Sequence, residues 1–174
     1  MVGGSMACRP SLSGAPVAFP TTSGDAAFPL AEATIATLQD GLDSGEWTVR
    51  LILETYLTRI DQLNLSGSAL RAVLETNPDA FAIADQLDRD WQGRGSRGPL
   101  HGVPVLLKDN IDTGDRMTTT AGSLALNGWV PPMDSEVARR LRKAGALLIG
   151  KANLSEWANF RSTRSSSGWI ARGG

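Results

Sequence analysis

Cysteine and histidine are almost absent from the 174-residue sequence, which holds one of each. Cys8 cannot form a disulfide within the chain, because it has no second cysteine as a partner. His101 cannot build a multi-histidine zinc site alone. We therefore expect no disulfide and no metal site of this kind, and nothing else in the sequence predicts a cofactor.

An excess of positive charge and long apolar runs are also missing. The chain has 17 basic and 18 acidic residues, a net charge of -1, without the basic stripe that a nucleic-acid partner requires. No apolar run approaches the ~20 residues of a membrane span, and residues 1–28 lack the basic start and apolar core of a secretory signal. We expect neither a nucleic acid nor a membrane as partner, and we favour a cytoplasmic location. The oligomeric state is left open.

The composition divides the chain into two parts. Residues 1–28 are rich in Gly, Ser, Pro, Ala and Thr, which predicts a disordered or poorly packed extension. Over the whole chain, 41% of residues are hydrophobic and 20% are charged, as in ordinary globular proteins. Residues 29–174 are therefore expected to fold.

Helical periodicity marks several segments of the folded part. After Thr48, apolar residues recur at helical spacing through residues 49–63, which predicts a helix capped by Thr48. A shorter amphipathic helix is predicted within residues 30–42 and a last helical turn within residues 154–160. Asn77 and Pro78 predict the start of a third helix, whose expected buried face is Ala80, Ile83, Ala84, Leu87 and Trp91. A fourth helix is predicted from Asp134 or Ser135 to a stop at Gly145, burying Val137, Ala138 and Leu141.

Three apolar segments, residues 69–75, 103–107 and 146–149, are predicted strands. Their alternation with helices indicates the α/β class, with a sheet flanked by helices. Three strands make a thin sheet, and residues 172–174 offer neither a helix cap nor a completed strand. We therefore expect the chain to be part of a larger domain.

Lys108 directly follows the apolar strand segment and precedes Asp109 and Asn110. If the amine were buried, desolvation would disfavour its charged form and allow it to act as a base. Alternatively, the strand ends at Leu107 and Lys108 simply meets solvent, as most lysines do. Pro104 indicates an edge strand, because proline cannot donate to a strand ladder.

Two other motifs resemble parts of known sites, a phosphate loop and a serine triad. Residues 145–151 match most of the phosphate-loop pattern, but their centre, Ala-Leu-Leu-Ile, is typical of a strand, and Ala152 replaces the hydroxyl residue that would bind magnesium. We do not expect a nucleotide site and interpret Gly145 as a helix cap. The run Ser165, Ser166 and Ser167 is interpreted as a polar loop, because no spacing to His101 supports a serine triad.

Four motifs together resemble the amidase signature family. In chain order they are GPLHGVPVLLKDNI at 98–111, TTTAGS at 118–123, AGALLIGKANLSEWA at 144–158 and SGWIARGG at 167–174. The match extends over about residues 30–174. The closing motif is similar to the peptide-amidase-like branch more than to the tRNA-amidotransferase branch.

The resemblance implies the N-terminal part of a large mixed sheet wrapped by helices. It also implies hydrolysis of amide bonds by a Ser–cis-Ser–Lys triad without a metal, with a small amide or peptide amide as substrate. Lys108 matches the catalytic lysine, and the surrounding motifs imply supporting roles in the cleft for Asp109, Asn110, Thr120, Gly122 and Ser123.

The resemblance also has gaps. Both family serines would lie beyond Gly174, so the 174-residue chain alone is predicted to be inactive. Ala152 stands where the family usually has threonine, and Ile170 replaces a small polar residue. The alternative hypothesis is a non-catalytic remnant or interaction module of the α/β class.

Overall fold

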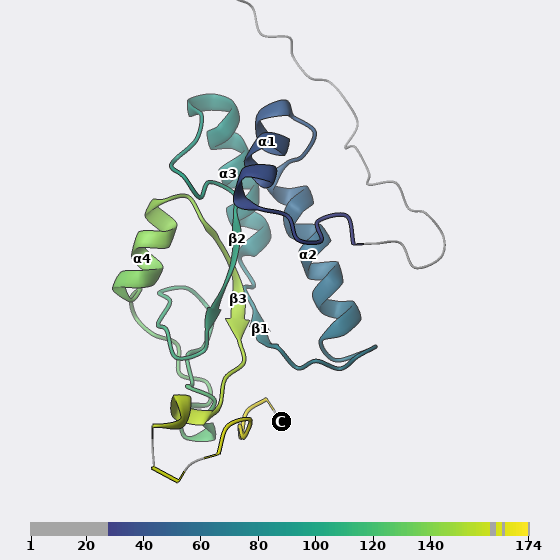
Figure 1. The fold of residues 1–174 in the computed structure, drawn as a ribbon. Coiled ribbons are helices and arrows are strands. Elements are labelled where there is room, and N and C mark those ends of the chain that lie inside the picture. The colour runs from purple at the N-terminus through teal and green to yellow at the C-terminus, as the bar shows by residue number, and fades with distance from the viewer. Residues whose placement is uncertain (1–27, 161–162, 165, 174) are drawn as a thin grey trace, which may run out of the picture.

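A computed structural model describes residues 28–160, 163–164 and 166–173. They form a mixed three-stranded sheet (Figure 1) with strands β1 (Val73–Thr76), β2 (Pro104–Lys108) and β3 (Leu147–Ala152) in the order β1-β3-β2. β1 runs antiparallel to β3, and β2 runs parallel to it. The predicted α/β class and mixed sheet are confirmed. The apolar start of β3 suits its central position, because a central strand is covered on both faces.

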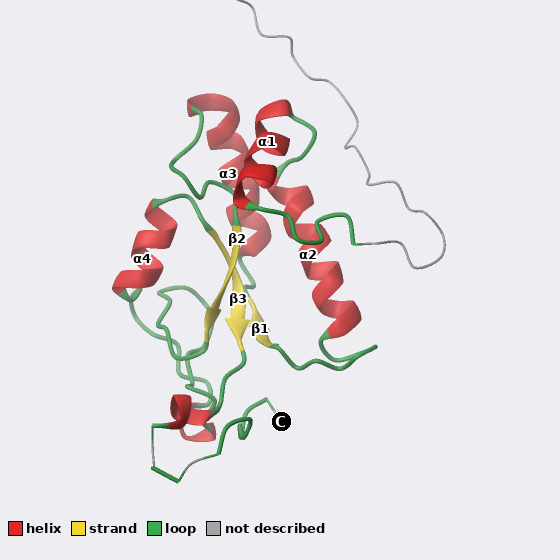
Figure 2. Cartoon of the chain, in the orientation of Figure 1, coloured by secondary structure: helices red, strands yellow, loops and turns green. Residues whose placement is uncertain are grey.

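Helices cover both faces of the sheet (Figure 2). Helices α1 (Ile35–Ser44), α2 (Val49–Leu63) and α3 (Ala80–Arg94) lie on one side, and the short α4 (Glu136–Lys143) lies on the other. Leu147 and Ile149 of β3 pack into the larger core with α1, α2 and α3, whereas Leu148 packs with Ala138 of α4. Successive residues of the strand therefore contribute to opposite cores, as the period of two requires.

Side-chain caps begin the predicted helices at two positions. Thr48 Oγ1 accepts a hydrogen bond of 3.0 Å from Leu51 N, and Ser135 Oγ accepts one of 3.3 Å from Ala138 N. Gly145, at φ +91°, follows α4 as expected of a helix stop. The third helix begins later than predicted, at Ala80. Asn77 instead uses its Oδ1 to accept from Asp79 N at 2.9 Å in the turn before the helix.

The structure corrects several other boundaries. β1 begins only at Val73, because Ala69 and Arg71 have φ values of 47° and 50° and are not extended. β3 continues past Ile149 to Ala152, since its backbone pairs with both neighbouring strands to that point. Val137, predicted to be buried, is 53% exposed, because Ala138 provides the buried contact of α4.

The last helical turn is a 3₁₀ segment, Glu156–Asn159, rather than an α-helical turn. Three of its residues, Trp157, Ala158 and Asn159, have left-handed φ values of 54°, 50° and 70°. This backbone conformation is uncommon for residues other than glycine, so apolar periodicity alone could not indicate it.

The start of the described chain is packed rather than loose. Phe28, the last residue of the predicted extension, meets Tyr56 of α2 edge to face, with ring centroids 5.3 Å apart. The rest of that extension lies outside the described residues. No helix in the described part of the chain is long and apolar enough to cross a membrane.

The single histidine lies fully buried in the turn before β2. His101 Nδ1 accepts a hydrogen bond of 2.9 Å from Arg97 N, so the ring proton belongs on Nε2, which lies 3.0 Å from Leu87 O. This assignment follows from the hydrogen-bond network. Burial lowers the pKa of His101, and the nearby charge of Arg97 adds to this effect, whereas the bond to Leu87 O opposes it. The folded protein therefore favours the neutral ring.

The free energy of unfolding is expected to fall as the pH drops from about 7 toward 5. The unfolded chain, with a histidine pKa near 6.5, takes up a proton before the folded chain does, so stability is complete above that pKa and is lost below it. The slope contributed by one such group is at most about 1.4 kcal/mol per pH unit. Urea unfolding across this range measures it.

The matched variant is His101→Gln, which offers a donor and an acceptor without titrating. Carboxylates contribute equally to both proteins, so the difference between their pH profiles isolates the histidine. If the free energies of unfolding of the two proteins changed in parallel with pH, the prediction would be contradicted.

Candidate functional site

The site is organised by the carboxylate of Asp109, which is fully buried immediately after β2. Its oxygens accept hydrogen bonds from Thr120 Oγ1 at 2.5 Å, Thr120 N at 3.3 Å and Gly122 N at 3.4 Å. Its own backbone N donates to Ala152 O of β3 at 3.0 Å. Asp109 therefore fixes the end of β2 both to the sheet and to the loop carrying Thr120 and Gly122.

Gly122 tolerates no side chain in this loop. Its φ is +75°, and a Cβ there would approach the side chain of Ile170 to 2.9 Å. Ile170 is itself buried. Ile170 thus packs against the loop held by Asp109.

Arg172 joins the same network from the C-terminal end of the described chain. Its Nη1 lies 3.2 Å from Asp109 Oδ1, and its Nη2 lies 2.7 Å from Glu75 Oε2 at the end of β1. The Glu75 carboxylate also accepts from Thr118 N and from the hydroxyl of Thr118. One guanidinium therefore links β1, the turn after β2 and the C-terminal segment, using the fork geometry that suits two carboxylates.

The fully buried lysine of the site is Lys151 on the central strand. Its Nζ donates to Ile111 O at 2.6 Å and to Thr119 Oγ1 at 2.7 Å. Burial lowers the pKa of Lys151, and the nearby carboxylates, Asp109 first among them, oppose that shift. The hydrogen bonds tie the chain after β2, at Ile111, to the Thr119 loop.

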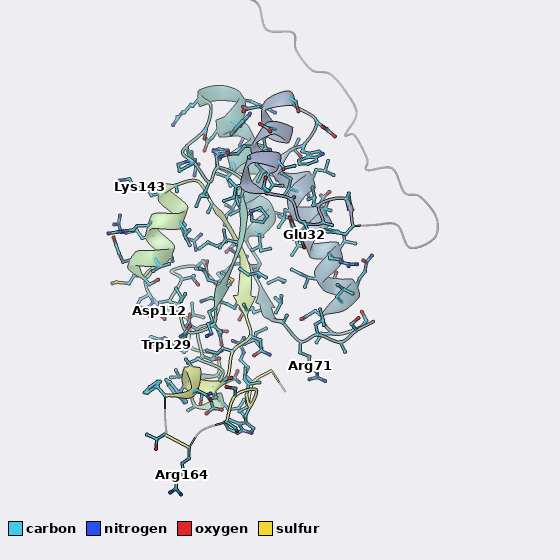
Figure 3. The ribbon with its side chains drawn as sticks, viewed as in Figure 1. Glu32, Arg71, Asp112, Trp129, Lys143 and Arg164 are labelled. Atoms are coloured by element: carbon cyan, nitrogen blue, oxygen red, sulfur yellow. The ribbon has the colours of Figure 1, made fainter. Side chains whose placement is uncertain are left out.

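Lys108 lies in a contrasting environment, four residues before Asp112, which is labelled in Figure 3. It ends the edge strand β2, and its side chain is exposed. Of the two alternatives that the sequence left open, a buried amine and a lysine that meets solvent, the described residues show the second. The alternation of β2 explains the exposure, since Leu107 points into the core and Lys108 points away from it. The Lys108 side chain makes no hydrogen bond or ion pair with the described residues.

The structure brings some of the other predicted site residues together. Asp109, Thr120 and Gly122 form one hydrogen-bonded group, as described above. Ser123 is buried but acts as the N-cap of the 3₁₀ segment Leu124–Leu126, accepting from Ala125 N at 3.4 Å. Asn110 is exposed and makes no side-chain hydrogen bond within the described part. In residues 28–160, 163–164 and 166–173, no three His, Cys, Asp or Glu side chains are grouped as a metal site would need.

Sequence reasoning missed Glu75, Thr119, Lys151 and Arg172. A signal existed for Lys151, because it follows an apolar segment in the same way as Lys108 does. Ending the predicted strand at Ile149 concealed it. Arg172 gave no local signal, since its partners Asp109 and Glu75 lie 63 and 97 residues away in the sequence.

Comparison with known proteins identifies the class to which this fold and site belong. The amidase family model matches residues 51–171. The chain therefore belongs to the amidase family.

Individual relatives agree with this assignment. A solved peptide amidase from Stenotrophomonas maltophilia is 52% identical, with a TM-score of 0.80 over 84% of this chain and 30% of that one. An Arabidopsis thaliana protein named a probable amidase is 47% identical over 84% of this chain. A solved amidase family protein from Bacillus anthracis is 36% identical, with a TM-score of 0.78 over 83% of this chain. The chain spans about 28% of the Arabidopsis relative and 28% of the Bacillus one.

The two lysines at the ends of neighbouring strands are expected to differ in their contribution to stability. In the pairing of β2 with β3, Leu107 lies beside Lys151, and Lys108 lies beside Ala152. Lys151→Met removes both hydrogen bonds of the buried amine and leaves Ile111 O and Thr119 Oγ1 without that donor. It should lower the free energy of unfolding by about 1–3 kcal/mol.

Lys108→Met is the matched control, because it makes the same chemical change at an exposed position. Its effect should stay within about 0.5 kcal/mol. Urea unfolding of the three proteins provides the comparison. Equal losses in the two variants would show that burial does not distinguish these lysines.

Proposed function

We propose that this chain carries the catalytic lysine of a hydrolase that cleaves the carbon–nitrogen bond of linear amides. The proposed substrate is a small amide or a peptide amide. Family membership supports the reaction class, and the position of Lys108 supports its role. Its side chain is unengaged within the described residues, while the next residue, Asp109, is held by buried hydrogen bonds.

In the proposed mechanism, Lys108 accepts a proton relayed through a cis-serine from a nucleophilic serine. The nucleophile's Oγ attacks the amide carbonyl carbon and forms an acyl-enzyme as the carbon–nitrogen bond breaks. The leaving nitrogen takes the proton back, and water then releases the acyl group. A base must be neutral, whereas exposure to water favours the charged amine. We therefore propose that Lys108 acts only when further protein covers it.

The 174-residue chain is expected to hydrolyse no amide by this route, because a lysine without its serine partners cannot perform acyl transfer. A chimera supplies those partners. In this chimera, residues 30–173 replace the matching segment of the Stenotrophomonas maltophilia peptide amidase. The chimera and the 174-residue chain are assayed against the same panel of small amides. The chimera should turn over substrate, and Lys108→Ala should lower its kcat/KM by about 10²–10⁴-fold.

Lys143→Ala serves as the control, since Lys143 is an exposed lysine at the end of α4. It should leave kcat/KM unchanged. Turnover by the 174-residue chain that disappears in Lys108→Ala would refute the need for the serines. Full activity of the Lys108→Ala chimera would refute the role of the lysine.

A further inference from the structure

The loop after β2, which carries Thr118 and Thr120, is held by two carboxylates that bind the same guanidinium. Asp109, at the start of the loop, accepts a hydrogen bond of 2.5 Å from Thr120 Oγ1. Glu75 of β1 accepts from Thr118 N at 3.2 Å. Arg172 reaches both acids, with Nη1 at 3.2 Å from Asp109 Oδ1 and Nη2 at 2.7 Å from Glu75 Oε2. The loop is therefore closed on a pair of acids that one cation holds together.

Burial makes this arrangement depend on the charge of Arg172. The Asp109 side chain is fully buried, and the side chains of Glu75 and Arg172 are only 23% and 16% exposed. Two anions held close together away from water repel each other, and each needs an opposite charge or several hydrogen bonds. A planar guanidinium can bind two carboxylates at once, whereas an ammonium lacks this fork. Removal of the guanidinium would leave two opposed acids at the point where the loop closes.

The same contacts hold the backbone next to Lys108. Asp109 N donates to Ala152 O of β3 at 3.0 Å, and Asp109 O accepts from Ala121 N at 2.8 Å. Both peptide units of Asp109 are therefore held between the central strand and the loop, and the first of these units is shared with Lys108. Because Arg172 binds the Asp109 carboxylate, its loss would let this unit move. A displacement of about 1 Å can lower the rate of an enzyme by about 10²-fold.

Arg172 also connects the loop to the C-terminal segment, which lies beyond the carboxyl ends of β2 and β3 (Figure 1). Its backbone N donates to Gly122 O at 3.1 Å, and Ile170, two residues earlier, packs against Gly122. In the proposed function, the serines follow this segment in the chain. The position of the segment relative to Lys108 would therefore set the distance across which a proton passes, and that distance must stay within hydrogen-bond reach.

We propose that Arg172 is a positioning residue, which holds the turn at Lys108 against the C-terminal segment by binding Asp109 and Glu75 together. In this role it contacts neither the substrate nor the reacting atoms and acts through Asp109. The proposal rests on the proposed function for the role of Lys108. Its structural part, the immobilisation of the turn, needs no serine and can be measured in the 174-residue chain.

The first test is amide hydrogen exchange, followed by NMR in the 174-residue chain. Arg172→Gln should accelerate exchange at the Asp109 and Ala121 amides at least about tenfold, because the loop loses its charged hydrogen bonds and opens more often. Arg71→Gln is the matched control, since Arg71, labelled in Figure 3, is exposed and its Nη1 donates to Gly173 O at 3.3 Å. It should change these rates less than about twofold. Unchanged exchange in Arg172→Gln, or equal acceleration in both variants, would overturn the proposal.

The second test uses the chimera. Arg172→Gln should lower kcat at least about tenfold and change KM less than about twofold, because a displaced base slows the chemical step without altering the contacts to the substrate. Arg71→Gln should leave both constants unchanged. A lower melting temperature of Arg172→Gln with an unchanged kcat would show a merely structural role and overturn the proposal.

A compensating change tests the charge. Asp109→Asn in the Arg172→Gln background removes one of the opposed acids and keeps an acceptor for Thr120. Compared with Arg172→Gln alone, this double variant should exchange at least about threefold more slowly at Ala121 and recover at least about threefold in kcat. Absence of this compensation would overturn the proposal.

Arg172→Lys keeps the charge without the fork. Its exchange rates and its kcat should lie between those of the unmodified protein and Arg172→Gln, and it provides the same comparison if Arg172→Gln does not fold. Values equal to those of the unmodified protein would show that the fork is not required and overturn the proposal. An inactive chimera with Arg172 intact, together with the expected exchange rates, would count against the proposed function alone.

Discussion

The buried carboxylate of Asp109 is the interaction on which the site depends. An ionised carboxylate without exposure to water is stable only when its lone pairs are satisfied. Thr120, Gly122 and Arg172 supply the hydrogen bonds, from the loop after β2 and from the C-terminal segment. The requirement to satisfy one charge therefore gathers segments that share no secondary-structure element.

Two buried or nearly buried basic side chains make the other contacts that hold the site together. Arg172 reaches Asp109 and Glu75 and so joins the C-terminal segment to two strands. Lys151 forms no ion pair at salt-bridge distance with a described acidic residue and instead donates to Ile111 O and Thr119 Oγ1. Guanidinium and ammonium groups are suited to these separate tasks, because the former is a planar fork and the latter a compact donor. Together they hold the polypeptide around Lys108 without touching the Lys108 amine.

The features that could be predicted from the sequence are those that depend on residues close together in the chain. Thr48 and Ser135 cap their helices as expected, because a cap needs only a hydroxyl and an amide three residues later. The burial of each lysine could not be predicted in this way, since it depends on how the strands pair and on what covers each face. The central strand β3 buries Lys151, whereas the alternation of β2 buries Leu107 and exposes Lys108. Strand order is set by non-local pairing, and so are the contacts of Arg172. The family resemblance supplied the role proposed for Lys108, which its environment alone does not supply.

The contrast between these lysines clarifies what the described part of the chain contributes to the proposed site. A general base must be neutral and must reach its partner, and these conditions oppose each other when an amine lies on an open surface. Here the backbone around Lys108 is fixed by Asp109, while its amine is left accessible. The same turn carries Asn110 and Asp112, whose side chains make no hydrogen bond within the described residues. The geometry of the turn therefore sets the position of the Lys108 backbone, whereas the neutral state that a base requires depends on what surrounds the amine.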